Sequence, residues 1–96
     1  MIALSYSRRE VEGLEKTVVI QLEPGLQARP AAQFVQKANA FVSEIYIEIE
    51  NKRINAKSIM GLMSLALAKG TEITIKASGP DETQAIEELT AFISGE

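Results

Sequence analysis

The chain has 96 residues, which is enough for one domain with a modest hydrophobic core. Its net charge of −3 argues against binding to nucleic acid or to an anionic membrane through general electrostatic attraction. Cysteine and histidine are both absent, so disulfides and thiolate chemistry are excluded and no transition-metal site is expected. No apolar run approaches the ~20 residues of a membrane span, and we place the protein in the cytoplasm.

The chain begins with a segment, residues 1–15, that we interpret as an extension to a single domain over 16–96. Charged side chains crowd this segment and Gly13 interrupts it, which fits a disordered tail. Ile2, Leu4 and Tyr6 alternate, so a short extra strand fits equally well. The domain starts with a strand over 16–23, followed by a turn at Pro24-Gly25. The inner face of this strand has the alternate residues Val18, Ile20 and Leu22.

A helix follows the turn, with Pro30 in its first turn. The next strand, over 43–50, alternates between isoleucines that face inward and polar residues that face outward. Asn51-Lys52 forms a turn into a short return strand over 53–56. In the helix with Pro30 in its first turn, apolar residues recur at helical spacing and form one face. They are Ala31, Phe34, Val35, Ala38, Phe41 and Val42.

A second helix, over 58–67, has Ser58 as its N-cap and is closed by Gly70. A strand over 71–78 leads to the last helix, where Asp81 and the glutamine three residues later form a capping box. The core stripe of that helix comprises Ala85, Ile86, Leu89, Phe92 and Ile93. The order β-α-β-β-α-β-α predicts an α+β fold, with two helices covering one face of a four-stranded, mostly antiparallel sheet and the short middle helix at its edge.

The entry to the first helix is a candidate anion site. A helix N-terminus has unpaired backbone N–H groups and about half a positive charge. No Ser, Thr, Asp or Asn lies between Gly25 and Ala32 to occupy those groups, and Arg29 lies beside them. Spacing alone leaves two interpretations open: an anion pocket, and a plain helix start with water on its donors.

Gln27 limits the chemistry of this loop. A carboxamide nitrogen is delocalised into its carbonyl, so it is not a useful nucleophile, whereas imidazole can accept a phosphoryl group. Gln27 can hydrogen-bond through both ends of its amide. We therefore predict no catalytic residue here.

The second helix is a candidate regulatory surface. Ser58 fits a simple capping role, and a phosphate there would add roughly −1.5 to −2 charges beside the helix N-terminus, favoured by up to about 2 kcal/mol. A short helix this apolar cannot easily bury every face at a sheet edge. Its apolar residues fit either the core or an exposed patch that includes Ile59, Met60 and Met63.

Two stretches are similar to motifs of HPr, the phosphocarrier family of the bacterial sugar phosphotransferase system. Residues 25–32, Gly-Leu-Gln-Ala-Arg-Pro-Ala-Ala, resemble its active-site loop, and residues 57–65, Lys-Ser-Ile-Met-Gly-Leu-Met-Ser-Leu, resemble its regulatory serine motif in low-GC Gram-positive bacteria. The resemblance covers about residues 16–93 and implies an HPr-like open-faced β-sandwich. In that family a histidine takes up the phosphoryl group at the position of Gln27, and the glutamine points to the family's catabolite-repression type.

The resemblance implies a regulator that is not an enzyme and has no cofactor or metal. A bifunctional HPr kinase/phosphorylase would phosphorylate Ser58. The phosphorylated form would be a corepressor of catabolite control protein A, a LacI-type regulator that itself contacts DNA. Arg29 would pair with the phosphate across the interface. Further contacts would come from Ala32, Gln36, Ile59, Met60 and Met63.

Three other functions remain as alternatives. The first is a working phosphocarrier, which Gln27 argues against. The second is a small-molecule-binding α/β module, because a fold does not determine function. The third is an HPr-like regulator that binds a metabolic enzyme directly. Family resemblance also leaves the oligomeric state open between a monomer and a homodimer that exchanges the first strand through a hinge at Pro24-Gly25.

Overall fold

A computed structural model describes residues 13–23 and 25–95. All strand pairs in it are antiparallel, with order β1-β6-β3-β4 in a four-stranded sheet and β2-β5 in a second, two-stranded sheet. The elements are β1 (Leu14–Val19), β2 (Gly25–Leu26), α2 (Ala28–Asn39), β3 (Glu44–Ile49), β4 (Lys52–Asn55), α3 (Ile59–Leu65), β5 (Leu67–Ala68), β6 (Glu72–Ser78) and α4 (Glu82–Ile93). Residues 1–12, most of the expected extension, lie outside the described residues.

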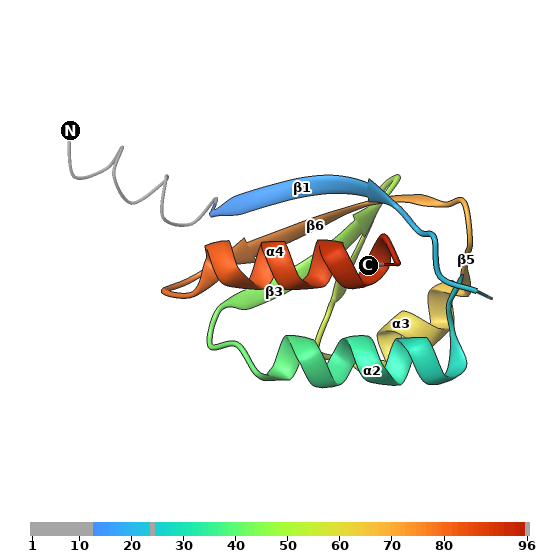
Figure 1. The fold of residues 1–96 in the computed structure, drawn as a ribbon, viewed down its shortest axis with the longest axis horizontal. Helices are drawn as coiled ribbons and strands as arrows, with labels where there is room; N and C mark the ends of the chain where they lie inside the picture. The colour runs from blue at the N-terminus through green and yellow to red at the C-terminus, as the bar shows by residue number, and fades with distance from the viewer. Residues whose placement is uncertain (1–12, 24, 96) are drawn as a thin grey trace.

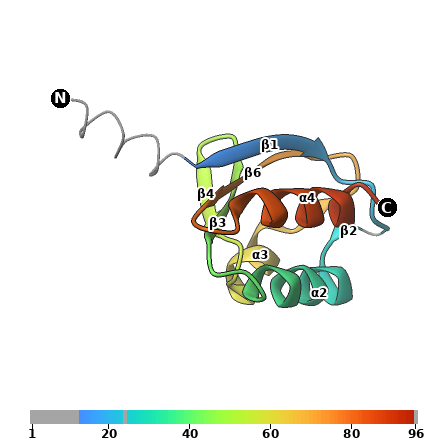
Figure 2. The same ribbon diagram turned by 60° about the vertical axis from the view of Figure 1, so that its left-hand side comes forward.

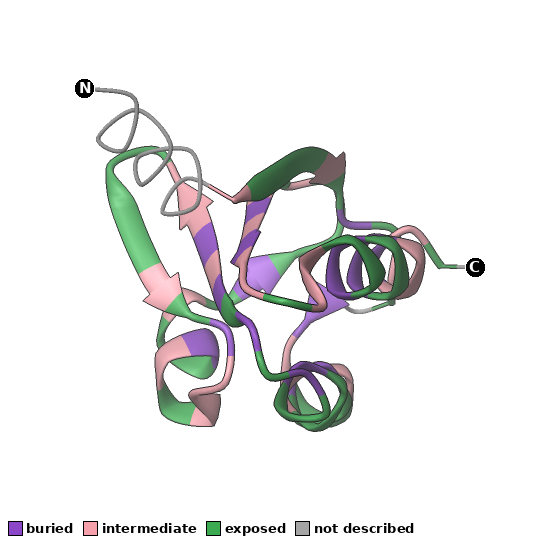
Figure 3. Cartoon of the chain, turned by 90° about the vertical axis from the view of Figure 1, so that its left-hand side faces the viewer, coloured by how far each residue is buried: buried purple, intermediate pink, exposed green. Residues whose placement is uncertain are grey.

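The helices lie together on one side of the four-stranded sheet. Helices α2 and α4 run alongside each other there, and the short α3 packs against α2 and β4 at the sheet's edge (Figures 1 and 2). Buried residues gather between these two layers (Figure 3), and Phe34, Ile47 and Leu89 have no solvent exposure. No described helix covers the opposite face of the sheet. The predicted α+β, open-faced sandwich is confirmed.

Strand β3 has the alternation expected from its sequence. Ile45 and Ile47 are buried, while Glu44 is exposed and Tyr46 and Glu48 are half-buried on the other face. Because side chains alternate across a strand, this pattern sets the register against the helices. The pairing Ile47↔Ile75 places two inward-facing isoleucines side by side in the core.

The first strand begins at Leu14 and ends at Val19, so the predicted range of 16–23 is wrong. Beyond Val19 the backbone no longer pairs with β6 and forms other hydrogen bonds. The carbonyl of Ile20 accepts from the N–H of Gly70 at 2.8 Å, and the N–H of Gln21 donates to the carbonyl of Ile93 at 2.9 Å. Ile20 nevertheless stays fully buried, so the predicted inner face is retained.

The short sheet of β2 and β5 has no counterpart in the sequence prediction. Each strand has two residues, which is too short to produce a period, and their partners are about forty residues apart in the chain. Leu67 belongs to β5 and is buried there. The predicted helix over 58–67 therefore ends early, at Leu65, and its C-cap is Ala66 in the left-handed conformation with φ 49° instead of Gly70.

The predicted capping box at the last helix is also wrong. The carboxylate of Asp81 does not cap its own helix; it accepts hydrogen bonds from the backbone N–H groups of Val42 and Ser43, at 2.9 and 3.0 Å, and from the Ser43 hydroxyl. Glu82 instead accepts from the N–H of Gly79 at 3.0 Å. The loop before α4 is thus bonded to the loop that connects α2 with β3.

Helix α2 ends three residues before the end of its predicted apolar face, and the β3–β4 hairpin loop is shifted by one residue. Helix α2 ends at Asn39, so Val42 is outside it and 75% exposed, although the helical spacing predicts it on the apolar face. The hairpin loop is Glu50-Asn51, one residue earlier than predicted, because Ile49 pairs with Lys52. Glu50 takes a φ of 54° at the first loop position.

Candidate functional site

The start of α2 is open to solvent. Gln27 occupies the N-cap with extended backbone angles, and among the described residues no side chain caps the helix and no acidic residue lies in its first turn. Arg29 is exposed and forms no ion pair with any residue that the structure describes. The uncapped backbone donors and the unpaired Arg29 side chain therefore both belong to the first turn of α2, and the structure leaves open both interpretations of this helix start.

The backbone of this loop is strained and tightly supported. Ala28 has a φ of 52°, a conformation that costs a non-glycine residue of the order of 1–3 kcal/mol. Gly25 lies against β5 so closely that an added Cβ would come within 2.4 Å of the carbonyl oxygen of Leu67. The amide of Gln27 also points at that carbonyl, at 3.4 Å. The small β2–β5 sheet therefore connects the start of α2 to the end of α3.

Ser58 is the N-cap of α3, as predicted. Its side-chain oxygen accepts a hydrogen bond from the backbone N–H of Gly61 at 3.1 Å, and its side chain is half-buried. The loop before it is ordered by two contacts of Lys57: its N–H donates to the side chain of Asn55 at 2.8 Å, and its ammonium donates to the carbonyl of Phe41 at 2.7 Å. Ser58 therefore has a defined position at a helix start.

Helix α3 buries one apolar residue and exposes others. Leu62 is completely buried, whereas Met60 is 79% exposed and Met63 53% exposed. Ile59 is half-buried beside the N-cap. Of the two interpretations that the sequence left open, the exposed patch therefore holds for the two methionines. Contiguous exposed methionines are typical of adaptable binding surfaces.

The partner-facing residues predicted on α2 share one side of that helix. Arg29, Ala32 and Gln36 are all exposed, and their spacing of three and four residues places them in one row. Helix α3 packs beside α2 (Figure 2). The two helices thus form one side of the molecule. We call the set Arg29, Ala32, Gln36, Ser58, Ile59, Met60 and Met63 the Ser58 surface.

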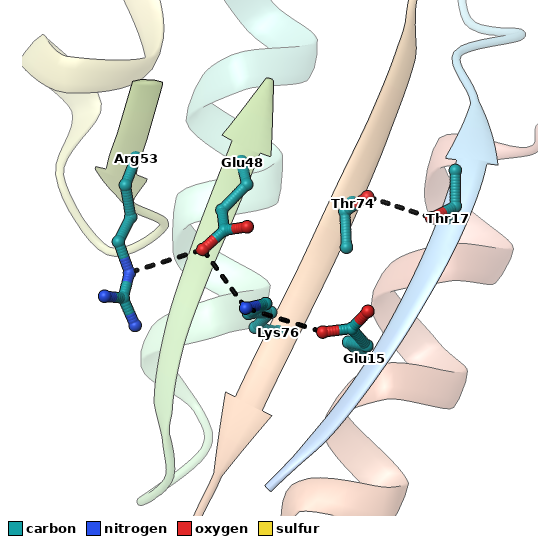
Figure 4. Close-up of polar contacts among 6 residues, drawn as sticks. All are labelled: Glu15, Thr17, Glu48, Arg53, Thr74 and Lys76. Carbon is teal, nitrogen blue, oxygen red and sulfur yellow. Dashed lines mark hydrogen bonds and ion pairs between the residues drawn. The ribbon is translucent and has the colours of Figure 1, made fainter. Parts of the chain in front are cut away.

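A second polar region lies on the face of the sheet that no described helix covers, which we call the open face. No sequence motif marks this region. The ammonium of Lys76 lies 3.3 Å from a carboxylate oxygen of Glu48 and 3.5 Å from one of Glu15, and Arg53 lies 3.7 Å from Glu48 (Figure 4). Hydrogen bonding and the negative charge of Glu48, with a smaller effect from Glu15, raise the pKa of Lys76. The alternation of side chains along each strand predicts which residues face outward. Only the order in which the strands pair brings the four charged residues together across the sheet.

Asp81 differs in role from its prediction as a helix cap. The hydrogen bond from the Ser43 hydroxyl, followed by that from the Val42 backbone, lowers the pKa of Asp81 below its ordinary value. Its role is structural, because it joins the loop before α4 to the loop between α2 and β3. Within the described ranges, no group of acidic side chains could hold a metal ion, and no helix is long and apolar enough to cross a bilayer.

These features agree with comparison to known sequences and structures. A family model described as "PTS HPr component phosphorylation site" matches residues 14–95. The chain therefore belongs to the HPr family, as its two motifs indicated.

Three similar proteins sharpen the assignment. The chain is 59% identical over 83 residues to the HPr-like protein Crh of Halalkalibacterium halodurans, covering 86% of this chain and 99% of that protein. The crystal structure of the phosphocarrier protein HPr from Bacillus anthracis has a TM-score of 0.81 at 52% identity, covering 83% of this chain and 95% of that one. The catabolite-repression protein Crh of Bacillus subtilis, whose crystal structure is a domain-swapped, intertwined dimer, has a TM-score of 0.70 at 52% identity, covering 82% and 86%. The chain is thus an HPr-like protein with relatives named Crh.

Proposed function

We propose that this protein is a regulator of carbon catabolite repression that is switched by phosphorylation of Ser58 and does not carry phosphoryl groups. Its phosphorylated form acts as a corepressor of catabolite control protein A, a LacI-type regulator, in the cytoplasm. The observation that carries the proposal is the position of Ser58 at the N-cap of a helix whose exposed side presents Met60 and Met63. The resemblance to proteins named Crh supports it.

The absence of carrier activity follows from the chemistry of the α2 start. Gln27 stands where the family's phosphocarriers have histidine, and none of the 96 residues is a histidine. Its amide is directed at the Leu67 carbonyl and offers no nucleophilic lone pair. Enzyme I and labelled phosphoenolpyruvate should therefore leave the protein unlabelled, and Gln27→His is the matched variant that should regain some transfer because Arg29 and the open helix start remain.

A phosphate on Ser58 suits the local geometry. The Ser58 oxygen already accepts from the N–H of Gly61, so phosphate oxygens can take over that donor at a helix N-terminus with little rearrangement. Arg29 is exposed and without an ion-pair partner among the described residues, which leaves its guanidinium available for phosphate or carboxylate groups at an interface. Ala32, Gln36 and Ile59 complete the proposed contact surface.

The phosphorylation step can be tested with HPr kinase/phosphorylase and ATP. Intact-mass measurement should find one added phosphate, which is lost in Ser58→Ala. Ser64→Ala is the matched control, since Ser64 lies in the same helix and its hydroxyl donates to the Gly61 carbonyl within it. Phosphate on another residue would contradict the assignment of Ser58.

The corepressor step needs a separate binding experiment. Titration of catabolite control protein A should detect binding of the phosphorylated protein and much weaker binding of the unmodified protein or of Ser58→Ala. Equal binding of both forms would contradict a phosphorylation switch. A pull-down with both forms would also detect a metabolic enzyme bound at the same surface, which is the second candidate function.

The oligomeric state belongs to the same proposal. Strand β1 lies at an edge of the sheet and pairs only with β6 among the described strands, so its exchange between two copies would leave the pairing of β6 with β3 intact. The swapped dimer of the Bacillus subtilis relative supports this exchange as an alternative to a monomer. Light scattering across a concentration series distinguishes the two.

A further inference from the structure

Helix α3 divides its apolar residues between the core and the solvent. It lies beside α2 (Figure 2), and Leu62 is completely buried, whereas Met60 and Met63 are 79% and 53% exposed. The two methionines are three residues apart, so they are neighbours on one side of the helix. Their thioether groups are therefore open to small reagents in solution.

Methionine is the only sulfur-containing residue type in this chain. The sequence has no cysteine and three methionines, of which two belong to α3, while Met1 lies outside the described residues. Because no thiol is present to react first, a mild oxidant such as hydrogen peroxide reacts most readily with exposed thioethers. The two methionines of α3 are thus the candidate oxidation site of the described domain.

The composition of α3 makes its surface sensitive to such a reaction. No residue from Ile59 to Leu65 is charged, so a protein bound to this side of the helix contacts mainly apolar side chains. A sulfoxide is polar, and burying it in an apolar contact without a hydrogen-bond donor is unfavourable. Oxidation therefore acts against the same apolar contact that the exposed methionines provide.

We propose that Met60 and Met63 form a reversible oxidation site, and that their sulfoxides weaken partner binding at the Ser58 surface, an effect that rests on the function proposed above. A sulfur lone pair attacks one oxygen of hydrogen peroxide, the O–O bond breaks as the S–O bond forms, and the other oxygen leaves as water. The sulfur is oxidised and the peroxide is reduced. A methionine sulfoxide reductase reverses the change by removing the oxygen as water while a dithiol is oxidised to a disulfide.

The domain should remain folded when both methionines are oxidised. Helix α3 is anchored by Leu62, and its start is capped by the Ser58 oxygen, which accepts from the N–H of Gly61 at 3.1 Å. Neither contact involves a thioether, and the added oxygen of an exposed side chain remains in water. Loss of binding by a folded, oxidised protein is therefore an effect on the surface and not on stability.

Hydrogen peroxide treatment of the full chain tests the oxidation site by itself. Peptide mapping by mass spectrometry should find one added oxygen on Met60 and one on Met63 while the protein is still folded. Thermal denaturation should give nearly the same melting temperature before and after treatment. Methionines that react only after unfolding, or a fold that is lost on oxidation, would overturn the site.

The effect on binding requires protein that is phosphorylated at Ser58 first, then oxidised and freed of peroxide. Each sulfoxide should weaken binding to catabolite control protein A roughly tenfold, which corresponds to the burial of a polar group without a partner. Treatment with a methionine sulfoxide reductase should restore the binding. Equal binding before and after oxidation would refute this effect.

A double variant and the untreated protein make the result specific. Met60→Leu with Met63→Leu retains Met1, so peroxide should not change the affinity of this variant from its own untreated value. The same loss of affinity in the variant would overturn the assignment to α3. Failure of the untreated phosphorylated protein to bind would instead refute the corepressor function and the effect of oxidation on it, but not the oxidation site, which peptide mapping tests separately.

Discussion

The Ser58 surface and the open face of the sheet satisfy their polar groups in different ways. On the open face, cations and carboxylates of neighbouring strands pair with one another, so Lys76 and Arg53 are already neutralised within the chain. On the Ser58 surface, Arg29 has no ion-pair partner among the described residues, and Met60 and Met63 lie in solvent. A surface that leaves a guanidinium and apolar side chains without partners suits the protein contact that we propose for it, whereas an internally paired surface mainly stabilises the sheet.

The largest expected effect distinguishes the buried side of α3 from its exposed side. Leu62→Ala should lower the free energy of unfolding by about 2–5 kcal/mol, because it leaves a cavity where Leu62 is completely buried. Met63→Ala is the matched control and should change it by less than about 0.5 kcal/mol. Urea denaturation monitored by circular dichroism measures both. Similar losses for the two variants would mean that Met63 is also part of the core.

The next largest effect contrasts the arginines of the two surfaces. Arg29→Ala should weaken binding of the Ser58-phosphorylated protein to catabolite control protein A roughly 10- to 100-fold, because hydrogen bonds to charged groups contribute about 1.5–3 kcal/mol. Arg53→Ala should leave that binding unchanged. Calorimetric titration of the two variants decides the comparison, and equal weakening would remove the distinction between the surfaces.

Acid sensitivity should come from a site outside both surfaces. The pKa of Asp81 is lowered in the folded state, so its contribution to stability is present above the ordinary value of 3.8 and is lost as the pH falls through the lower folded-state value. Asp81→Asn should remove this component of the pH dependence while the neutral side chain keeps some contact with Ser43. Melting temperatures between pH 2 and pH 6 measure it, and parallel curves for both proteins would contradict the assignment.

A smaller effect concerns the end of α3. Ala66 has a φ of 49°, which costs an alanine roughly 1–2 kcal/mol but costs glycine nothing. Glycine has the higher entropy in the unfolded chain, so Ala66→Gly should stabilise the protein by only about 0.5–1 kcal/mol. Ala40→Gly is the control. Ala40 is the C-cap of α2 with φ −74°, so glycine relieves no strain there and should lower the stability of the protein. Denaturation midpoints distinguish the two outcomes.

The smallest effect is expected on the open face itself. Arg53→Gln removes an exposed ion pair with Glu48 and should change the free energy of unfolding by less than about 1 kcal/mol. The difference should shrink further at 1 M salt, where exposed charges are screened. A large effect that persists in high salt would show that Arg53 contributes mainly through its packing on the Tyr46 ring.

The amino-acid sequence by itself determined the local elements and the chemical identity of the Ser58 surface. The alternation in β3 depends on residues two apart, and the Ser58 cap depends on an N–H three residues away, so both follow from short-range rules. The glutamine at position 27 likewise needs no structure to be recognised as a poor nucleophile. Only the tertiary structure decided the pairing of β2 with β5, the bonds of Asp81 to the loop before β3, and the ion-pair row across the open face. Apart from the Arg53–Glu48 contact within the β3–β4 hairpin, each of these joins residues about 30 to 60 positions apart. Such pairings depend on the order of the strands and the packing of the helices, which no local period encodes.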